Sequence, residues 1–156
     1  MLALTPFAAL SQGANVAFGG FSHDTTLPVE VSADSLQINQ ADGSAQFVGN
    51  VVIGQGEMRI TAGKVRVEYS SDEGDATGQI SRLIASGGVT LVNGAEAAEA
   101  QEAVYTIATG KVMMSGGVIL TQGRNALSAE RLVVNLKDGT GVMEGRVKSI
   151  IQTTGN

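Results

Sequence analysis

Apolar and polar residues alternate along most of the chain, and three stretches follow one template. Each copy starts with Gly, then Asn or Gly, then Val, has a second apolar residue two places later, and reaches Gln-Gly or Asn-Gly. The copies start at Gly49, Gly87 and Gly116, and each has an Ala 13 residues after its first Gly. A period of two that runs into a Gly-containing turn is typical of a strand entering a hairpin. The template therefore predicts a repeated hairpin.

A second alternating stretch follows the Ala of each copy, and a degenerate half-copy precedes the first one at Ala33-Asp34, Leu36 and Ile38. Side chains alternate between the two faces of a strand. Positions with the same odd or even spacing from the repeated Gly and Ala residues should therefore lie on one face of each strand. We therefore expect a common set of side chains to point between packed sheets. The set is Val29, Val31, Leu36, Ile38, Phe47, Val51, Ile53, Met58, Ile60, Val65, Val67, Val89, Leu91, Tyr105, Ile107, Val118, Leu120, Leu132 and Val134.

Further Gly residues stand where strands should reverse. Asp42-Gly43, Thr109-Gly110 and Asp138-Gly139 supply the positive φ that two-residue hairpins need. No convincing 3.6-residue period is present outside the first residues. The prediction is an all-β fold of consecutive antiparallel hairpins, and periodicity alone leaves a sandwich, a jelly roll and a solenoid open.

Composition narrows the kind of ligand. The 156 residues suffice for one domain with a core, 43% of them are hydrophobic, and only 4% are aromatic. Such an aliphatic interior suits hydrocarbon better than stacked bases or sugars. The net charge of −5 and the lack of a basic run argue against nucleic acid and anionic membrane surfaces. The absence of Cys excludes disulfides and Cys-type zinc sites.

No catalytic constellation is visible. The single histidine, His23, has no evident orienting partner. The acidic residues between Ser70 and Asp75 lack the spacing of a calcium loop. Glu96, Glu99 and Glu102 do not specify an acid/base pair. We expect no enzyme activity, no cofactor and no metal site.

The first residues differ in kind from the rest. Residues 1–10 are almost wholly apolar and end in small residues that suit signal peptidase, so we interpret residues 1–11 as the remnant of a secretory signal. A simple apolar tail is the alternative. About ten residues are too few to span a bilayer. We expect a flexible lead-in over residues 12–26, the β-domain over residues 27–151 and a short tail over residues 152–156.

The ordered series of motifs resembles a known family. It comprises Pro28-Val29-Glu30-Val31, Ala33-Asp34, Phe47-Val48-Gly49-Asn50-Val51, Gln55-Gly56, Ile60-Thr61-Ala62, Ala85-Ser86-Gly87-Gly88-Val89, Ala103-Val104-Tyr105, Gly116-Gly117-Val118 and Ala129-Glu130. In these motifs the chain resembles the LptA or OstA-like lipopolysaccharide-transport bridge proteins of the periplasm. The resemblance implies a slightly twisted, partly open antiparallel β-jelly roll built of repeated hairpins, with an aliphatic groove.

The resemblance also implies a function and partners. Such a protein would be periplasmic and would bind the lipid A acyl chains of lipopolysaccharide with the inward set listed above, with Thr25 and Val29 on the lip. Its edge strands would join inner-membrane and outer-membrane jelly-roll components, or further copies head to tail, through Pro28, Val29 and Val31 at one end and Arg146, Val147 and Ile150 at the other. The alternative is a surface or adhesin-like structural β-repeat protein with a dry core. Unequal spacing between the copies, 38 and then 29 residues, favours the jelly roll over a solenoid.

Overall fold

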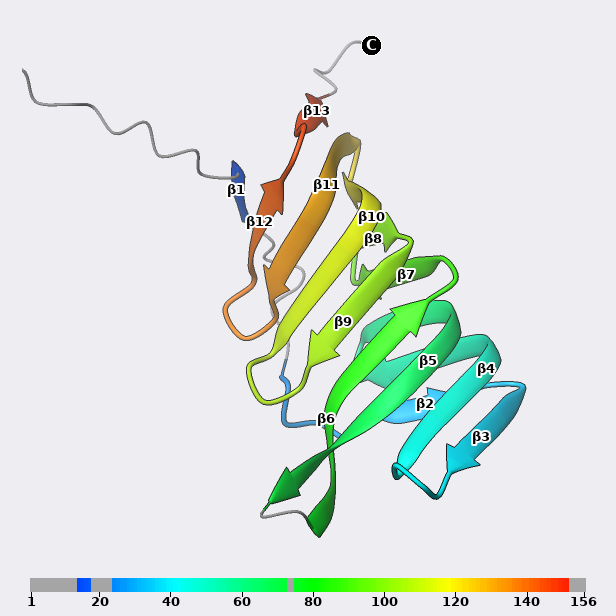
Figure 1. The fold of residues 1–156 in the computed structure, drawn as a ribbon. Coiled ribbons are helices and arrows are strands. Elements are labelled where there is room, and N and C mark those ends of the chain that lie inside the picture. The colour runs from blue at the N-terminus through cyan, green and yellow to red at the C-terminus, as the bar shows by residue number, and fades with distance from the viewer. Residues whose placement is uncertain (1–13, 18–23, 73–74, 152–156) are drawn as a thin grey trace, which may run out of the picture.

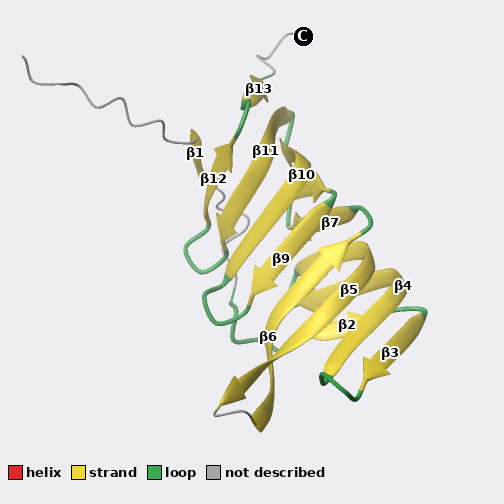
Figure 2. Cartoon of the chain, in the orientation of Figure 1, coloured by secondary structure: helices red, strands yellow, loops and turns green. Residues whose placement is uncertain are grey.

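A computed structural model describes residues 14–17, 24–72 and 75–151. The expected signal remnant over residues 1–11, His23 and the tail over residues 152–156 lie outside the described residues. The described chain consists of strands and connecting loops (Figure 2). Within these ranges, no helix has the length and apolar character needed to cross a membrane.

Thirteen strands follow one another along the described residues. They are β1 (Ala14–Ala17), β2 (Glu30–Ser32), β3 (Ser35–Asn39), β4 (Ser44–Gln55), β5 (Met58–Asp72), β6 (Asp75–Ser86), β7 (Val89–Asn93), β8 (Glu96–Ala100), β9 (Glu102–Thr106), β10 (Lys111–Gln122), β11 (Asn125–Asn135), β12 (Thr140–Glu144) and β13 (Lys148–Ile150).

These strands form two antiparallel sheets that share four long strands. Sheet I has the order β3-β4-β5-β6-β9-β10-β11-β12-β1. Sheet II has the order β2-β4-β5-β7-β8-β10-β11-β13. Strands β4, β5, β10 and β11 belong to both sheets because each bends partway along its length. The all-β hairpin fold is confirmed, and the two shared sheets make it a jelly roll rather than a solenoid (Figure 1).

Backbone bulges produce these bends, and they explain the sequence repeat. Gly49 and Asn50 have φ values of 86° and 48°, and together they stand opposite the single residue Gly63, so that pairing shifts between Val48 and Val51. Gly116 and Gly117, with φ values of 85° and 78°, make the same shift in β10. A two-against-one bulge bends its strand. The constant Gly-to-Ala distance is therefore the length of a sheet II hairpin.

A further bend occurs near the end of the chain. Gly145 and Arg146 have φ values of 83° and 49°, and Gly145 accepts a hydrogen bond of 2.9 Å from the backbone N–H of Glu130. Residues 141–151 therefore do not form one continuous strand. They are divided into β12 on sheet I and β13 on sheet II, because Gly145 and Arg146 bend the chain from one sheet to the other, as Gly49 and Asn50 do within β4.

The hairpin loops of sheet I differ from the expected two-residue turns. Gly43, Gly110 and Gly139 do have positive φ values of 68°, 68° and 71°. However, they end four-residue loops, since Asn39 pairs with Ser44, Thr106 with Lys111 and Asn135 with Thr140. Asp and Asn side chains stabilise two of these loops by binding backbone N–H groups two residues ahead.

Strand β1 was not expected. It pairs antiparallel with β12, from Ala14 opposite Met143 to Ala17 opposite Thr140, at the end of the molecule far from β3 (Figure 1). Within the lead-in expected over residues 12–26, residues 14–17 thus form a strand paired with β12. The pairing satisfies backbone groups along β12 that would otherwise form an open sheet edge.

Candidate functional site

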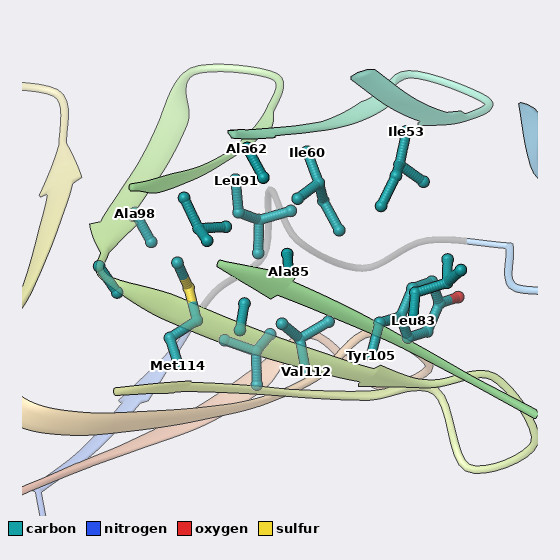
Figure 3. Packing of buried hydrophobic residues seen from close by; sticks show 14 of the residues in the cluster. Ile53, Ile60, Ala62, Leu83, Ala85, Leu91, Ala98, Tyr105, Val112 and Met114 are labelled. Carbon is teal, nitrogen blue, oxygen red and sulfur yellow. The ribbon is translucent and has the colours of Figure 1, made fainter. Parts of the chain in front are cut away.

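The space between the two sheets is lined by aliphatic side chains from both. Ile53, Ile60, Ala62, Leu91 and Ala98 of sheet II point toward Leu83, Ala85, Tyr105, Val112 and Met114 of sheet I (Figure 3). On sheet II the inward side chains form rows across the strands. One row next to the glycine bends and a second row in the middle of each strand are aliphatic, as expected for a hydrocarbon environment.

Most of the predicted inward set is buried, which confirms the strand register. The buried members are Val51, Ile53, Met58, Ile60, Val65, Val67, Val89, Leu91, Tyr105, Val118, Leu120, Leu132 and Val134. Four more are half-buried and pack against this core, namely Val29, Val31, Phe47 and Ile107. Whether any of them contacts lipid stays a prediction.

Two members of the inward set are exposed, and both lie on β3. Leu36 pairs with the half-buried Phe47, and Ile38 pairs with the buried Ala45, so both continue the inward rows of sheet I. Yet Leu36 is 49% and Ile38 is 67% exposed. The aliphatic interior is thus open to solvent at the β2 and β3 end of the jelly roll.

A third inward row on sheet II is polar and lies next to its hairpin turns. It runs Gln55, Met58, Asn93, Glu96, Gln122 and Asn125 across β4, β5, β7, β8, β10 and β11. We call it the polar rim. Three of its members are the Gln or Asn that precedes Gly in each sequence copy. Along each strand of sheet II, the interior therefore changes from two aliphatic rows near the glycine bends to the polar rim near the hairpin turns.

Gln55 fixes an N-terminal segment, residues 24–29, that we call the strap. Its side-chain Nε2 donates to the backbone oxygens of Thr25 and Leu27 at 3.1 and 2.8 Å. Thr25, predicted on the groove lip, is half-buried and lies beside Gly110 in a sheet I loop. The strap therefore lies between the hairpin ends of the two sheets, opposite the row of glycine bends.

Tyr105 completes this connection from sheet I. Its hydroxyl donates to Oε1 of Gln55 at 2.7 Å, and both side chains are 1% exposed. Burial raises the pKa of Tyr105 to about 12, against the smaller opposing effect of the Gln55 hydrogen bond. A neutral hydroxyl is thus held inside the protein, against the polar rim.

The sequence prediction missed Gln55 and Asn93 as interior residues. Their Gln-Gly and Asn-Gly dipeptides predict turns, and this interpretation does not require an inward side chain. The overlooked signal is parity, because Gln55 follows Val51 and Ile53 at a spacing of two, and Asn93 follows Val89 and Leu91 in the same way. Asn93 is 4% exposed, and its Nδ2 is buried without a hydrogen-bond partner.

The edge strands agree in part with the expectation. Of the predicted edge residues, Val31 lies in β2 and Ile150 in β13, and among the described strands each of these two strands has one neighbour, β4 and β11 respectively. Pro28 and Val29 precede β2, and Arg146 and Val147 belong to the bend before β13. On sheet I, β3 has one neighbour, whereas β12 is covered by β1.

The described part of the chain holds no group of three or more His, Cys, Asp or Glu side chains able to bind a metal ion. Charged side chains instead form cross-strand pairs on the outer faces, such as Arg82 with Glu68 and Arg131 with Glu144. Exposed pairs of this kind contribute little to stability.

Comparison with known proteins identifies a family that the chain matches. Residues 30–140 match the family model described as LptA/(LptD N-terminal domain) LPS transport protein. An uncharacterized protein, R00383 of Rhizobium meliloti (strain 1021), is 28% identical over 109 residues, which are 68% of this chain and 59% of that protein. The chain thus spans less than two thirds of the length of this curated relative.

The fold has a counterpart among solved structures. The crystal structure of LptH, described as the LptA-homologous periplasmic component of the conserved lipopolysaccharide transport device from Pseudomonas aeruginosa, superposes with a TM-score of 0.71 at 18% identity. The match covers 83% of this chain and 99% of LptH. At this identity the likeness supports the jelly-roll fold.

Proposed function

Because the chain belongs to the family of LptA and LptD N-terminal domain lipopolysaccharide transport proteins, we propose that it carries lipopolysaccharide across the periplasm, with the acyl chains between its two sheets. The observation that carries this proposal is the continuity of the inward aliphatic rows. They run from the buried core to Leu36 and Ile38, where the same face meets solvent. An open aliphatic end allows a hydrocarbon chain to enter.

Energetics explain why such a path is needed. Each methylene removed from water is worth about 0.8 kcal/mol, so several acyl chains oppose free diffusion by tens of kcal/mol. A lining of aliphatic side chains shields this surface without directional bonds that would trap the lipid. The net charge of −5 would also keep a phosphorylated head group in solvent.

A photo-crosslinking experiment in cells tests the path. A photoactivatable residue at Leu36 or Phe47, which face inward, should capture lipopolysaccharide. The same residue at the neighbouring Gln37 or Gln46, which have the opposite parity on β3 and β4, should not. Equal capture at all four positions would exclude an internal path, and the dry-core structural β-repeat would then be the better interpretation.

We further propose that copies, or membrane-bound relatives of this fold, join end to end through β13 of one subunit and β2 of the next. All pairs in sheet II are antiparallel, and the sheet has eight strands, so a translated copy would present β2 antiparallel to β13. We propose that residues 27–32 of one subunit pair antiparallel with residues 146–151 of the next, which places Glu30 opposite Lys148. Opposite charges at directly paired positions favour this alignment.

Cysteine crosslinking tests the junction, since the chain has no cysteine of its own. A subunit carrying Glu30→Cys mixed with one carrying Lys148→Cys should form a disulfide-linked dimer under mild oxidation. Glu30→Cys mixed with Arg131→Cys, which is exposed on sheet I, is the matched control. Equal dimer yields in both mixtures would contradict the proposed junction.

A further inference from the structure

The polar rim contains one buried donor that the protein leaves unused. Asn93 is 96% buried, points inward by the same parity as Val89 and Leu91, and its Nδ2 has no hydrogen-bond partner. A buried donor without an acceptor costs free energy, and nearly all such groups in folded proteins are paired. An unpaired amide in the interior of a binding protein is therefore a candidate contact for an absent ligand.

Another member of the rim shows which chemistry this row accommodates. Gln55, which lies in the same row as Asn93 with only Met58 between them, uses its side-chain amide to donate to two carbonyl oxygens of the strap. These acceptors are neutral amide carbonyls, and they lie at the hairpin-turn end of the aliphatic interior. Glu96 stands directly opposite Asn93 in the strand register, and its acidic group disfavours an anionic acceptor such as a phosphate at this position. The rim thus favours a neutral carbonyl.

The position of the rim relative to the aliphatic rows indicates where that carbonyl belongs. On β7, Asn93 follows Leu91 of the middle row and Val89 of the row beside the bends, and both are buried. A ligand with its hydrocarbon along these two rows would place the atom that joins hydrocarbon to head group at the rim. In an acylated amphiphile that atom is the carbonyl carbon of an ester or an amide.

We infer that Nδ2 of Asn93 donates a hydrogen bond to the ester or amide carbonyl through which an acyl chain is attached to its head group. This inference rests on the proposed function and adds a polar recognition point to it. It also gives a reason for the unpaired donor, which is satisfied when the ligand is bound. Proteins often retain local costs of this kind at functional sites.

The experiment compares two probes on the full chain. One is a lysophospholipid with a single ester-linked acyl chain, and the other is its ether-linked analogue with the same head group and chain length, which lacks the carbonyl. The unmodified protein should bind the ester about tenfold more tightly, as expected for one buried hydrogen bond. Asn93→Leu should bind both probes equally, while Val92→Leu, the outward neighbour on the same strand, should keep the ester preference.

Stability separates this role from a structural one. Asn93→Leu should be as stable as the parent or more stable, because it removes an unpaired buried polar group. The nearly isosteric Asn93→Asp, which cannot donate when ionised, should also lose the ester preference. Equal binding of ester and ether by the parent, or an ester preference that survives in both variants, would overturn the inference and leave an acyl-chain path intact. Failure of the parent to bind either probe would instead remove the path, and the inference with it.

Discussion

Tyr105 on β9 and Gln55 at the end of β4 form a hydrogen bond of 2.7 Å across the interior, between sheet I and sheet II. The same Gln55 holds the strap through Thr25 and Leu27. One buried amide thus connects both sheets and the segment that lies between their hairpin ends. Its three hydrogen bonds satisfy a polar group that would otherwise be costly in an aliphatic interior.

Removing the Tyr105 hydroxyl should weaken this connection. Tyr105→Phe leaves Oε1 of Gln55 without its donor and should lower the free energy of unfolding by about 1–3 kcal/mol at neutral pH. Chemical denaturation measures this loss, and Tyr69→Phe at an exposed position is the control. Equal losses in the two variants would show that the buried hydrogen bond adds nothing.

The raised pKa of Tyr105 predicts that the protein loses stability at high pH. The folded-state pKa of Tyr105 is raised from 10.0 to about 12, so between these values the unfolded chain releases a proton that the folded chain keeps. Stability is therefore full below about pH 10 and should fall by about 2–3 kcal/mol as the pH rises through 12. Tyr105→Phe should show a smaller fall over this window. Denaturation curves at pH 9 and 12 would contradict the assignment if both proteins lost stability equally.

The glycine bends predict a difference between adjacent substitutions. Gly116 and Gly117 both have positive φ, but a Cβ at Gly116 would lie 2.8 Å from Cβ of Gln101, whereas one at Gly117 meets nothing within 4 Å. Gly117→Ala should cost about 1–2 kcal/mol from backbone conformation alone. Gly116→Ala should cost more because it adds a clash with Gln101, which lies between β8 and β9. If the free energy of unfolding fell equally in the two variants, the expected clash at Gly116 would be contradicted.

The sheet I loops predict a local titration effect. The hydroxyl of Thr140 and, to a smaller extent, its backbone N–H hold the pKa of Asp138 below its ordinary value. This lowered pKa contributes stability above the unfolded value of 3.8 that is lost as the pH falls through the folded pKa. Thr140→Val should move the pKa of Asp138 back toward 3.8. Carboxyl NMR titration measures it, with Asp42 in the equivalent loop as an internal reference that should not move.

Sequence reasoning succeeded where the determinants are local. The hairpins, their turns and the inward register follow from a period of two around glycines whose φ must be positive, and these signals lie within a few residues of one another. Gly145-Arg146 was missed because Arg seldom adopts positive φ, so the dipeptide does not resemble Gly-Asn or Gly-Gly. Only its spacing of 16 residues from Ala129, the same as from Ala100 to Gly116, could have revealed it.

Features that depend on distant pairing could not be predicted. Nothing within residues 14–17 indicates β12 as a neighbour, since the partner residues lie more than 120 positions away. The hydrogen bonds of Gln55 likewise need the strap and Tyr105, 28 to 50 residues distant. Turn chemistry by itself accounts for the Gln-Gly dipeptide, so the dipeptide does not indicate that the Gln55 side chain points inward.

Because β1 covers the edge of β12, we predict that loss of β1 promotes association between subunits. Without β1, sheets I and II have eight strands each, and a translated copy would add β3 antiparallel to β12 and β2 antiparallel to β13. With β1 in place, an added β3 would have to pair parallel to it. Val16→Pro removes a backbone donor opposite Gly141 and should increase the multimer fraction in sedimentation velocity. Val16→Ala, which keeps the donor, should behave like the parent, and equal association of all three would contradict a blocking role.

If subunits join as proposed above, the position of β1 makes their association depend on effective concentration. A strand carried by the same chain as the edge it covers competes at an effective concentration on the order of millimolar. A free subunit in dilute solution does not reach this concentration. A partner would reach a comparable effective concentration if it were held in place by a membrane or by an existing junction between β2 and β13. Elongation would then begin at anchored ends and remain rare between free subunits, without any change in the intrinsic affinity of the strands.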